Sequence, residues 1–389
     1  TATSLKNTFE SVWSKMYNLI TSVNIIIEKC DQTDVLSAQY QKMIKGEALA
    51  LRAMYHLDLL RIFGPIMSEN ATGQAIPYVT VSDQNVQSIL TADVVIGKII
   101  NDLSQASELL KASDPIITDG VMSQPTAEDD TDFCYRQYRL NYYAVQVLLA
   151  RANMWKGDKD KALSIAENVI SETAAIFPFT SRNTAIGNKP DRVFSSEVIF
   201  SLYNTNRINV YRKYFASTLD PRNILSFYGT LDNGRVPDLY DSQNDIRYGM
   251  WAAPSEGEND LIFTKYEDVS VKDGSTDHYC YMLPLIRLSE LYLIAAECED
   301  NFDQAVSYLN KIRNVRNCPN LEPIDETELK ECIISEFRKE MIGEGQMFFF
   351  YKRNAMESIP NGASASGILS MPLNNYVVPI PDSEIDNRM

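Results

Sequence analysis

The sequence predicts a mainly α fold, in which four tetratricopeptide-like helical pairs form a right-handed frame with a long loop-rich insertion containing short β-strands. Three observations lead to this prediction. Apolar residues recur at helical spacing over several long segments. A helix–turn–helix arrangement occurs twice, with small residues at the same interval. Residues 176–282, by contrast, are rich in turn residues, aromatic residues and short β-like runs.

The first helical pair is expected at the N-terminal end of the chain. Residues 9–30 carry apolar side chains at helical intervals, and residues 39–63 do so more densely. Gly64 and Pro65 then end the second helix. After a loop rich in glycine, proline, asparagine and threonine, a further helix is expected over residues 86–113. These segments are predicted to pack as antiparallel helices.

Two later segments show the repeat most clearly. Ala152 and Ala162 lie on either side of one tight turn, and Ala295 and Ala305 bracket a second turn at the same interval of ten residues. Small residues there let two helices approach closely while large apolar residues flank them. The four pairs are predicted at residues 9–63, 86–157, 159–299 with the insertion, and 302–349. Two regions follow: an N-terminal helical region, 1–195, and a C-terminal region with the insertion and the last helical pairs, 196–389.

The insertion contains the β-like runs SEVIFSLYN and LIFTKYE, together with many tyrosine and phenylalanine residues. A rigid helical frame that carries a long, loop-rich excursion is a common arrangement for recognition, because loops can vary while the frame stays constant. We therefore expect the ligand-binding groups to come mainly from this segment.

Charge and composition exclude several classes of function. The chain of 389 residues has a formal net charge of −16, which opposes binding to nucleic acid or to anionic lipid. No apolar run approaches the ~20 residues that span a bilayer. The opening TATSLKNTFESVW has no signal-peptide pattern, so a targeting peptide is absent or has been removed. Six widely spaced cysteines without a CxxC motif are interpreted as buried thiols rather than a zinc or redox site: Cys30, Cys134, Cys280, Cys298, Cys318 and Cys332.

The stretch GEALALRAMYHLDLLRIFGP contains Glu47, His56 and Asp58, residue types that catalytic sites use. On a helix that turns about 100° per residue, His56 and Asp58 point to nearly opposite sides. Glu47 shares a face with Asp58 but lies roughly 16 Å away along the axis. We therefore interpret these residues as structural, with Asp58 paired to Arg61 and with Arg52 and His56 on the other face.

No nucleophile, zinc-protease, dinucleotide or phosphate-loop motif occurs, so no enzymatic activity is predicted. A glycoside hydrolase can operate with two carboxylates alone and remains an alternative, although no pair can be singled out. An acidic loop with Glu128, Asp129, Asp130 and Asp132 could bind calcium, yet it lacks the alternating pattern and central glycine of an EF-hand. We expect this loop to be solvated and no cofactor to be present.

Four stretches, in order along nearly the whole chain, resemble the SusD/RagB family of outer-membrane lipoproteins from Bacteroidetes. They are GEALALRAMYHLDLLRIFGPI, YYAVQVLLARANMWKGDKDKALSIAENVI, RLSELYLIAAE followed by EFRKEMIGEGQMFFFYKRN, and the C-terminal VVPIPDSEIDNRM. The sequence departs from the family pattern at Phe337, Gln346, Met347 and Phe348. Because these positions belong to the frame, they cast little doubt on the fold.

This resemblance implies a body of four tetratricopeptide-like units plus a more irregular ligand-binding part. It also implies a protein on the extracellular face of the outer membrane, held by a lipid on an N-terminal cysteine that lies upstream of this chain. Family members cap a SusC-like TonB-dependent transporter and capture glycans, or in some cases peptides, without performing chemistry on them. A glycan and such a transporter are therefore the expected partners, with a peptide as the alternative ligand.

Aromatic and polar residues outside the frame are the candidate ligand contacts. The C–H faces of sugar rings stack on aromatic side chains, and sugar hydroxyl groups need polar partners to replace water. Trp251 is the preferred anchor because the other two tryptophan residues, Trp13 and Trp155, lie on frame helices. For any single aromatic residue, a role in core packing remains the alternative. The predicted ligand-binding residues are Trp251, Tyr228, Tyr211, Tyr214 and Arg207 from the insertion, and Asn70 and Tyr78 from the loop after Phe63.

Overall fold

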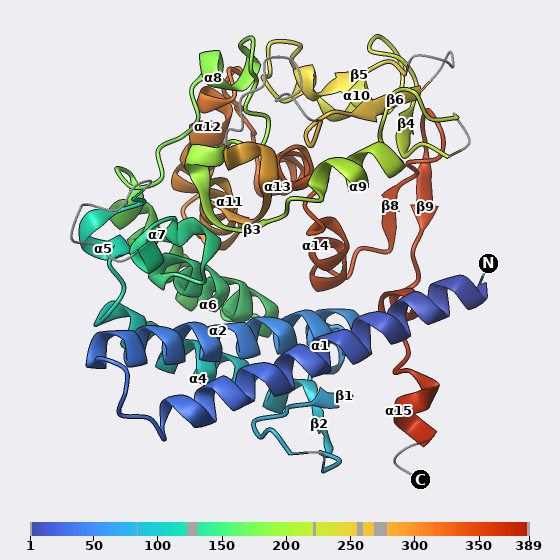
Figure 1. Ribbon diagram of the computed structural model, residues 1–389. Helices are drawn as coiled ribbons and strands as arrows, with labels where there is room; N and C mark the ends of the chain where they lie inside the picture. Colours follow the sequence, from blue (N-terminus) through green and yellow to red (C-terminus); the bar gives the residue numbers. More distant parts are fainter. Residues whose placement is uncertain are drawn as a thin grey trace. The chain divides into compact units, whose positions relative to one another are not determined.

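Two compact units make up the chain in the computed structural model, which describes residues 2–83, 85–122, 131–220, 223–254, 260–267 and 278–386 (Figure 1). Unit 1 comprises Thr1–Ile165, Phe348–Glu357 and Met371–Met389, and unit 2 comprises Ala166–Met347 and Ser358–Ser370. The boundary between the units thus falls near residue 165. The division predicted at residue 195 concerns regions of sequence and stays a prediction.

Unit 1 is a stack of helices with one small two-stranded sheet. Helix α2 packs against α1 and α4, and α4 packs in turn against α6. The strand that precedes α4 pairs with the strand after α3, so the predicted helix over residues 86–113 begins later, at Ala92. Its elements are α1 (Ala2–Cys30), α2 (Ala38–Phe63), α3 (Met67–Asn70), β1 (Gln74–Pro77), β2 (Ile89–Thr91), α4 (Ala92–Lys111), α5 (Ile116–Asp119), α6 (Tyr142–Lys156) and α15 (Asp382–Asp386).

Helix α2 begins and ends where the sequence predicts. The side chain of Ser37 caps its N-terminus by accepting a hydrogen bond from the amide of Tyr40 at 3.3 Å. At the other end the amide of Gly64 donates to the carbonyl of Leu60, and Pro65 prevents a further turn. Because α2 is covered by helices on two sides, it is apolar around most of its circumference.

Two glycines provide a matched test of how closely α2 and α4 pack. A Cβ atom at Gly46 of α2 would lie 2.8 Å from Cγ of Leu110, whereas a Cβ atom at Gly97 of α4 would meet nothing within 4 Å. We expect Gly97→Ala to raise the free energy of unfolding by about 0.5–1 kcal/mol, because alanine is the better helix former. Gly46→Ala is expected to lower it by about 1–2 kcal/mol through overpacking. Urea denaturation measures both, and an equal stabilisation by the two variants would contradict the close approach.

The polar residues of GEALALRAMYHLDLLRIFGP are structural, as predicted. His56 is fully buried, with Nδ1 2.8 Å from the carbonyl oxygen of Arg52 and Nε2 accepting from the amide of Val79 at 3.0 Å. Asp58 pairs with Arg61. Glu47 instead accepts from Arg136 at 2.6 Å, on another element.

Unit 2 combines short strands and turns with three longer helices, which come last among its helical elements in the chain. The β-like runs predicted in the insertion form β3 and β6, with β3 antiparallel to β7 and β6 between β4 and β5. Its elements are α8 (Arg182–Ile186), β3 (Val198–Tyr203), α9 (Arg207–Tyr214), β4 (Ser226–Tyr228), α10 (Arg235–Leu239), β5 (Trp251–Ala252), β6 (Asp260–Phe263), β7 (Met282–Arg287), α11 (Leu288–Cys298), α12 (Phe302–Val315), α13 (Glu326–Met341), β8 (Ser358–Pro360) and β9 (Ile368–Ser370). The ends of α7 (Lys159–Thr173) and α14 (Met347–Arg353) lie in different units.

A buried ion network ties the helices of unit 2 to its strands. Glu340 of α13 accepts hydrogen bonds from Arg316 at 2.7 Å, from Arg247 at 2.8 Å and from Arg287 at 2.8 Å. Basic and acidic members are equal in number, so their charges can balance one another, and Asp241, whose side chain is 46% exposed, is the member in contact with solvent. The members are Arg247, Lys265, Arg287, Arg313, Arg316 and Lys339 with Glu197, Asp241, Asp245, Glu336, Glu340 and Glu344.

The mainly helical fold with small sheets is confirmed, and the tetratricopeptide-like character of the helical pairs stays a prediction. Gly157 forms the predicted tight turn after α6, with φ of 88°. All six cysteines are free thiols; five are buried and Cys332 is half-buried. Among the described helices, none has the length and apolar character that crossing a membrane requires.

Candidate functional site

Two of the predicted ligand-binding residues, Tyr78 and Asn70, lie in unit 1, and they differ in exposure. Tyr78 is 6% exposed; its hydroxyl donates to Asp102 at 2.6 Å and its ring stacks on His56 with centroids 4.0 Å apart. Asn70, at the end of α3, is exposed. Tyr78 therefore supports the helical packing of unit 1, and Asn70 is the member of this pair whose side chain is accessible to a ligand.

Helix α9 carries three of the predicted ligand-binding residues, and these three differ in exposure. Arg207 is buried and donates to the carbonyl groups of Tyr279 and Met282 at 2.8 and 2.9 Å. Tyr211 is also buried, whereas Tyr214 at the helix end is 39% exposed. Arg207 thus holds the backbone of a neighbouring segment, and Tyr214 is the accessible candidate on this helix.

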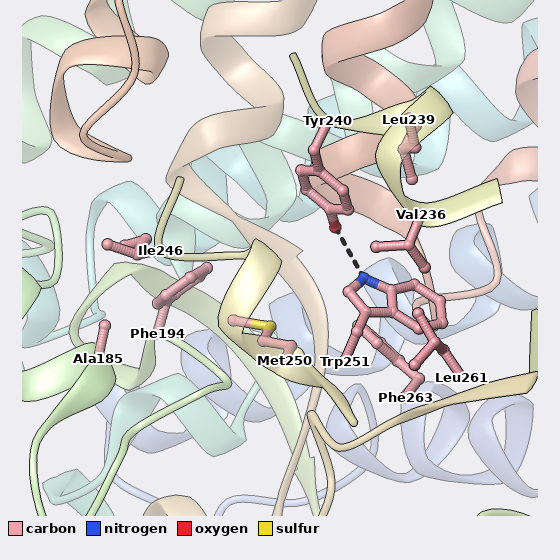
Figure 2. Close-up of a cluster of buried hydrophobic side chains, with 10 residues drawn as sticks. All are labelled: Ala185, Phe194, Val236, Leu239, Tyr240, Ile246, Met250, Trp251, Leu261 and Phe263. Atoms are coloured by element: carbon pink, nitrogen blue, oxygen red, sulfur yellow. Dashed lines mark hydrogen bonds between the residues drawn. The ribbon is translucent and has the colours of Figure 1, made fainter. Parts of the chain in front are cut away.

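Trp251, the predicted anchor, lies inside a hydrophobic cluster of unit 2 (Figure 2). Its side chain stacks on Phe227 with ring centroids 4.7 Å apart, and its indole nitrogen donates to the hydroxyl of Tyr240 at 3.3 Å. With only 6% of the residue exposed, its ring faces are covered by protein. In this structure Trp251 fills the packing role that was the alternative to a ligand contact.

The packing of Trp251 determines which side chain of β4 is exposed to solvent. Successive side chains of a strand point to opposite faces, so Phe227 packs inward on Trp251 while Tyr228 is 44% exposed. The amide of Leu225, just before β4, donates to the carbonyl of Tyr214 at 2.7 Å. This bond joins the end of α9 to the start of β4, and the two exposed tyrosines therefore belong to connected elements.

A pocket of about 330 Å³ lies elsewhere on unit 2, beside α8. We call it the α8 pocket. Its volume is at the lower end of the range for ligand sites, about 300–1,000 Å³. Ala185, Ile246 and Met250 contribute both to its wall and to the hydrophobic cluster in Figure 2, so a packed core supports it. The lining residues are Arg182, Ala185, Ile186, Gly187, Pro190, Arg192, Gln243, Asn244, Asp245, Ile246, Tyr248, Gly249 and Met250.

Hydrogen bonds to backbone groups hold the two lining segments of this pocket. Ser181 caps α8 by accepting from the amide of Thr184, whose carbonyl accepts from the amide of Asp191 at 2.9 Å. In the second segment the amide of Ile246 donates to the carbonyl of Arg316 at 3.0 Å. The side chain of Asn317 donates to the carbonyl of Asn244 at 3.0 Å. This second segment is therefore fixed to the end of α12, which the buried ion network also joins to α13.

The side chains around the pocket suit a polar ligand. Gln243 and Asn244 are exposed, and their side-chain amide groups have no hydrogen-bond partner in the part of the chain that the structure describes. Tyr248 is half-buried and packs edge-on against Tyr240, with ring centroids 5.7 Å apart. Amide groups that can both donate and accept, next to an aromatic ring, are the groups that a sugar requires.

The pocket offers binding groups but no pair of free carboxylates. Its acidic lining residue, Asp245, is held by Nε of Arg247 at 2.9 Å and by Nη2 of the same side chain at 2.6 Å. The carboxylate of Asp245 is thus fully buried and engaged with Arg247. The carboxylate-pair hydrolase considered from sequence thus finds no support at this site.

Most of the acidic loop that is expected to be solvated lies outside the described residues, because only Asp132 of its four carboxylates is among them. In the described ranges no three histidine, cysteine, aspartate or glutamate residues gather in a group that could hold a metal ion.

The α8 pocket is not evident from the sequence, because its lining residues come from two segments about fifty residues apart. The available signal was weak: an aromatic residue beside adjacent amide residues in the turn-rich DSQNDIRYGM stretch. Such patterns are common in loops, so periodicity could not have distinguished this one.

A mainly helical protein with a polar surface pocket belongs to the broad class of ligand-binding proteins built on a helical frame. A family model described as starch-binding and associating with the outer membrane matches residues 1–125, and the SusD family model matches residues 257–388. The chain belongs to the SusD/RagB family. The resemblance found in the four sequence stretches is confirmed.

Known relatives span most of the chain at low identity. A SusD-like protein of Formosa agariphila is 22% identical over 86% of this chain and 70% of that protein. A SusD superfamily protein from Bacteroides thetaiotaomicron has a TM-score of 0.75 and 23% identity, covering 96% of this chain and 83% of its own. Surface glycan-binding protein A from the same organism was solved with laminarihexaose. It has a TM-score of 0.66 and 17% identity, and the match covers 97% of this chain and 83% of that protein's chain. At these identities the solved structures establish the fold.

Proposed function

We propose that this protein captures a glycan at the extracellular face of the outer membrane and delivers it to a SusC-like TonB-dependent transporter. In this proposal a lipid anchor holds the protein to the membrane, and the glycan is bound without being cleaved. The observation that carries the proposal is a polar, aromatic-containing pocket in a SusD/RagB-family chain. The family description of starch binding and the laminarihexaose complex of a structural relative support it.

The proposed binding groups are those that a sugar can use. Amide side chains of Gln243 and Asn244 replace water around the hydroxyl groups, and the ring of Tyr248 contacts a C–H face. Tyr214 and Tyr228 are proposed as further contacts because their rings are exposed. Asn70 remains a proposed contact for the same reason.

The remaining predicted residues are proposed to act indirectly. Trp251, Tyr211, Tyr78 and Arg207 are each at most 6% exposed. Their side chains position the elements that carry exposed groups, as Trp251 does for Tyr228 through Phe227. A ligand can reach them only if these elements move, so we propose no direct contact.

A binding experiment tests the proposal with a variant of the α8 pocket. Isothermal titration against a panel of polysaccharides should identify at least one ligand, and the double variant Gln243→Ala/Asn244→Ala should bind it about 30-fold more weakly. This estimate assigns about 1 kcal/mol to each lost hydrogen bond. Gln304→Ala, at an exposed position of α12 outside the pocket, should leave the affinity within twofold.

Three outcomes would overturn parts of this proposal. Binding of peptides but of no glycan would assign the protein to the peptide-binding alternative. Release of reducing sugar from a bound glycan would show a hydrolase. A gene neighbourhood that lacks a TonB-dependent transporter gene would contradict the delivery role.

A further inference from the structure

The α8 pocket has a charge opposite to that of the protein as a whole. The chain carries a formal net charge of −16, yet two arginines, Arg182 and Arg192, line this pocket. The acidic lining residue is Asp245. Whether the pocket attracts anions depends on how each of these three side chains is already paired.

Arg182 is not neutralised by a neighbour. It is the first residue of α8, it is exposed, and its side chain forms neither an ion pair nor a hydrogen bond with any residue in the described ranges. A guanidinium group is permanently charged and presents donors in a planar fork that matches a carboxylate or a sulfate. Arg182 is therefore available to pair with an anionic group in the pocket.

Arg192 is held in place but only partly engaged. Its Nη1 donates to the carbonyl of Thr264 at 3.2 Å and to Glu267 at 2.7 Å. Its Nε and Nη2 have no partner among the residues that the structure describes. Glu267 is 37% exposed, so solvent screens the charge that it sets against Arg192. Two donors of an oriented guanidinium group thus remain for a ligand.

Asp245 does not offset these charges. Both of its carboxylate oxygens accept hydrogen bonds from Arg247, and its side chain is fully buried. Arg247 continues into the buried ion network, where it also contacts Glu336 and Glu340. The carboxylate charge is therefore balanced within the protein, and among the described lining residues Arg182 and Arg192 carry the charge that faces a ligand.

We propose that the α8 pocket selects acidic glycans, with Arg182 and Arg192 binding the carboxylate or sulfate groups of the sugar. Gln243 and Asn244 bind neighbouring hydroxyl groups in the same complex. This inference rests on the proposed glycan-binding function and specifies its substrate class. A neutral sugar hydroxyl can also accept a hydrogen bond from a guanidinium group, but a carboxylate or sulfate adds an opposite charge and can accept two such bonds at once.

Matched pairs of ligands test the charge requirement. Titration of the intact protein with oligogalacturonates and with their carboxyl-reduced counterparts changes the charge while keeping the sugar backbone. Carrageenan oligosaccharides and their desulfated forms do the same for sulfate. We expect at least one acidic form to bind at least tenfold more tightly than its neutral counterpart, and the two arms distinguish a carboxylate from a sulfate ligand.

A charge-matched variant tests the role of Arg182. Arg182→Gln should weaken binding of the acidic ligand by about tenfold or more, since one charge-assisted hydrogen bond contributes about 1.5–3 kcal/mol. Lys311→Gln removes the same charge at an exposed position of α12, outside the pocket, and should change the affinity less than twofold. This control separates a local contact from the change in net charge.

The failures of the two proposals are distinguishable. If neutral forms bind as tightly as acidic ones and Gln243→Ala/Asn244→Ala still weakens them, the acidic-glycan inference is wrong and glycan binding stands. Equal effects of Arg182→Gln and Lys311→Gln would also overturn the inference. If neither acidic nor neutral glycans bind, the proposed function itself fails.

Discussion

The Glu340→Gln variant is expected to lose about 3–5 kcal/mol of unfolding free energy. Glu340 is completely buried and its carboxylate accepts hydrogen bonds from Arg247, Arg287 and Arg316. The amide of glutamine has the same shape but no charge, and it would direct N–H donors toward guanidinium groups. Three buried cations would then lack a shared anion, which costs far more than the loss of one exposed pair.

The pKa of Glu340 agrees with this interpretation. Burial opposes ionisation of its carboxyl group, but the guanidinium groups of Arg316, Arg287 and Arg247 outweigh burial and hold its pKa well below the usual range. A carboxylate with a depressed pKa contributes stability that is present above the unfolded-state pKa and is lost as the pH falls through the folded-state pKa. The ion pairs are therefore intact at neutral pH, where the variant should be measured.

A second variant on the same helix serves as the control. Glu331→Gln removes a charge at an exposed position of α13 and should change the unfolding free energy by less than about 0.5 kcal/mol. Guanidinium denaturation followed by circular dichroism measures both. A loss at Glu340 as small as that at Glu331 would show that the buried ion network contributes little to stability.

Acidification from pH 7 to pH 5 is expected to remove about 2 kcal/mol of stability through His56 alone. Burial lowers the pKa of this imidazole to about 3, although its hydrogen bond to the carbonyl of Arg52 acts in the opposite direction. Because Nε2 accepts from the amide of Val79, the neutral ring carries its proton on Nδ1 and donates it to the carbonyl of Arg52. A second proton would break the bond to Val79.

The direction of this pH effect follows from proton uptake. In the unfolded chain the imidazole of His56 has a pKa near 6.5, whereas in the folded protein its pKa is about 3. Between these values the unfolded state binds more protons, so stability falls as the pH falls. The depressed pKa of Glu340 keeps its ion pairs intact in this window.

The comparison of two variants isolates the contribution of His56. His56→Gln places an amide oxygen near the position of Nε2, and it should reduce the loss of stability between pH 7 and pH 5 by about 2 kcal/mol. Gln304→Ala, at an exposed position of α12 without an ionisable side chain, should retain the slope of the original protein. Urea denaturation at several pH values provides these slopes, and equal slopes for His56→Gln and the original protein would contradict the assignment.

Local sequence was sufficient to predict much of unit 1. The spacing of apolar residues, together with Gly64 and Pro65, predicted α2 almost to its observed ends. Helical geometry also separated His56 from Asp58, and the structure places them in unrelated contacts. These predictions succeeded because the helical period and the helix-ending residues act over only a few positions.

Trp251 shows where sequence reasoning lacked information. Its strand, β5, is only two residues long, so no alternation of polar and apolar residues indicates which face is buried. The answer depends on Phe227 and Phe263, which reach it from other strands. A lone tryptophan in a turn-rich segment therefore looked like a ligand anchor although it packs in the core.

The amino-acid sequence by itself determined the helical frame, the absence of a catalytic motif and the signature of the family, because these depend on local periodicity and on residue order. Tertiary structure alone decided that Arg287 and Glu340, which belong to that signature, meet in a buried ion network. It also decided that Arg182 and Asn244 share a pocket. These pairs are far apart along the chain, and only the packing of the helices and strands that carry them brings their side chains together.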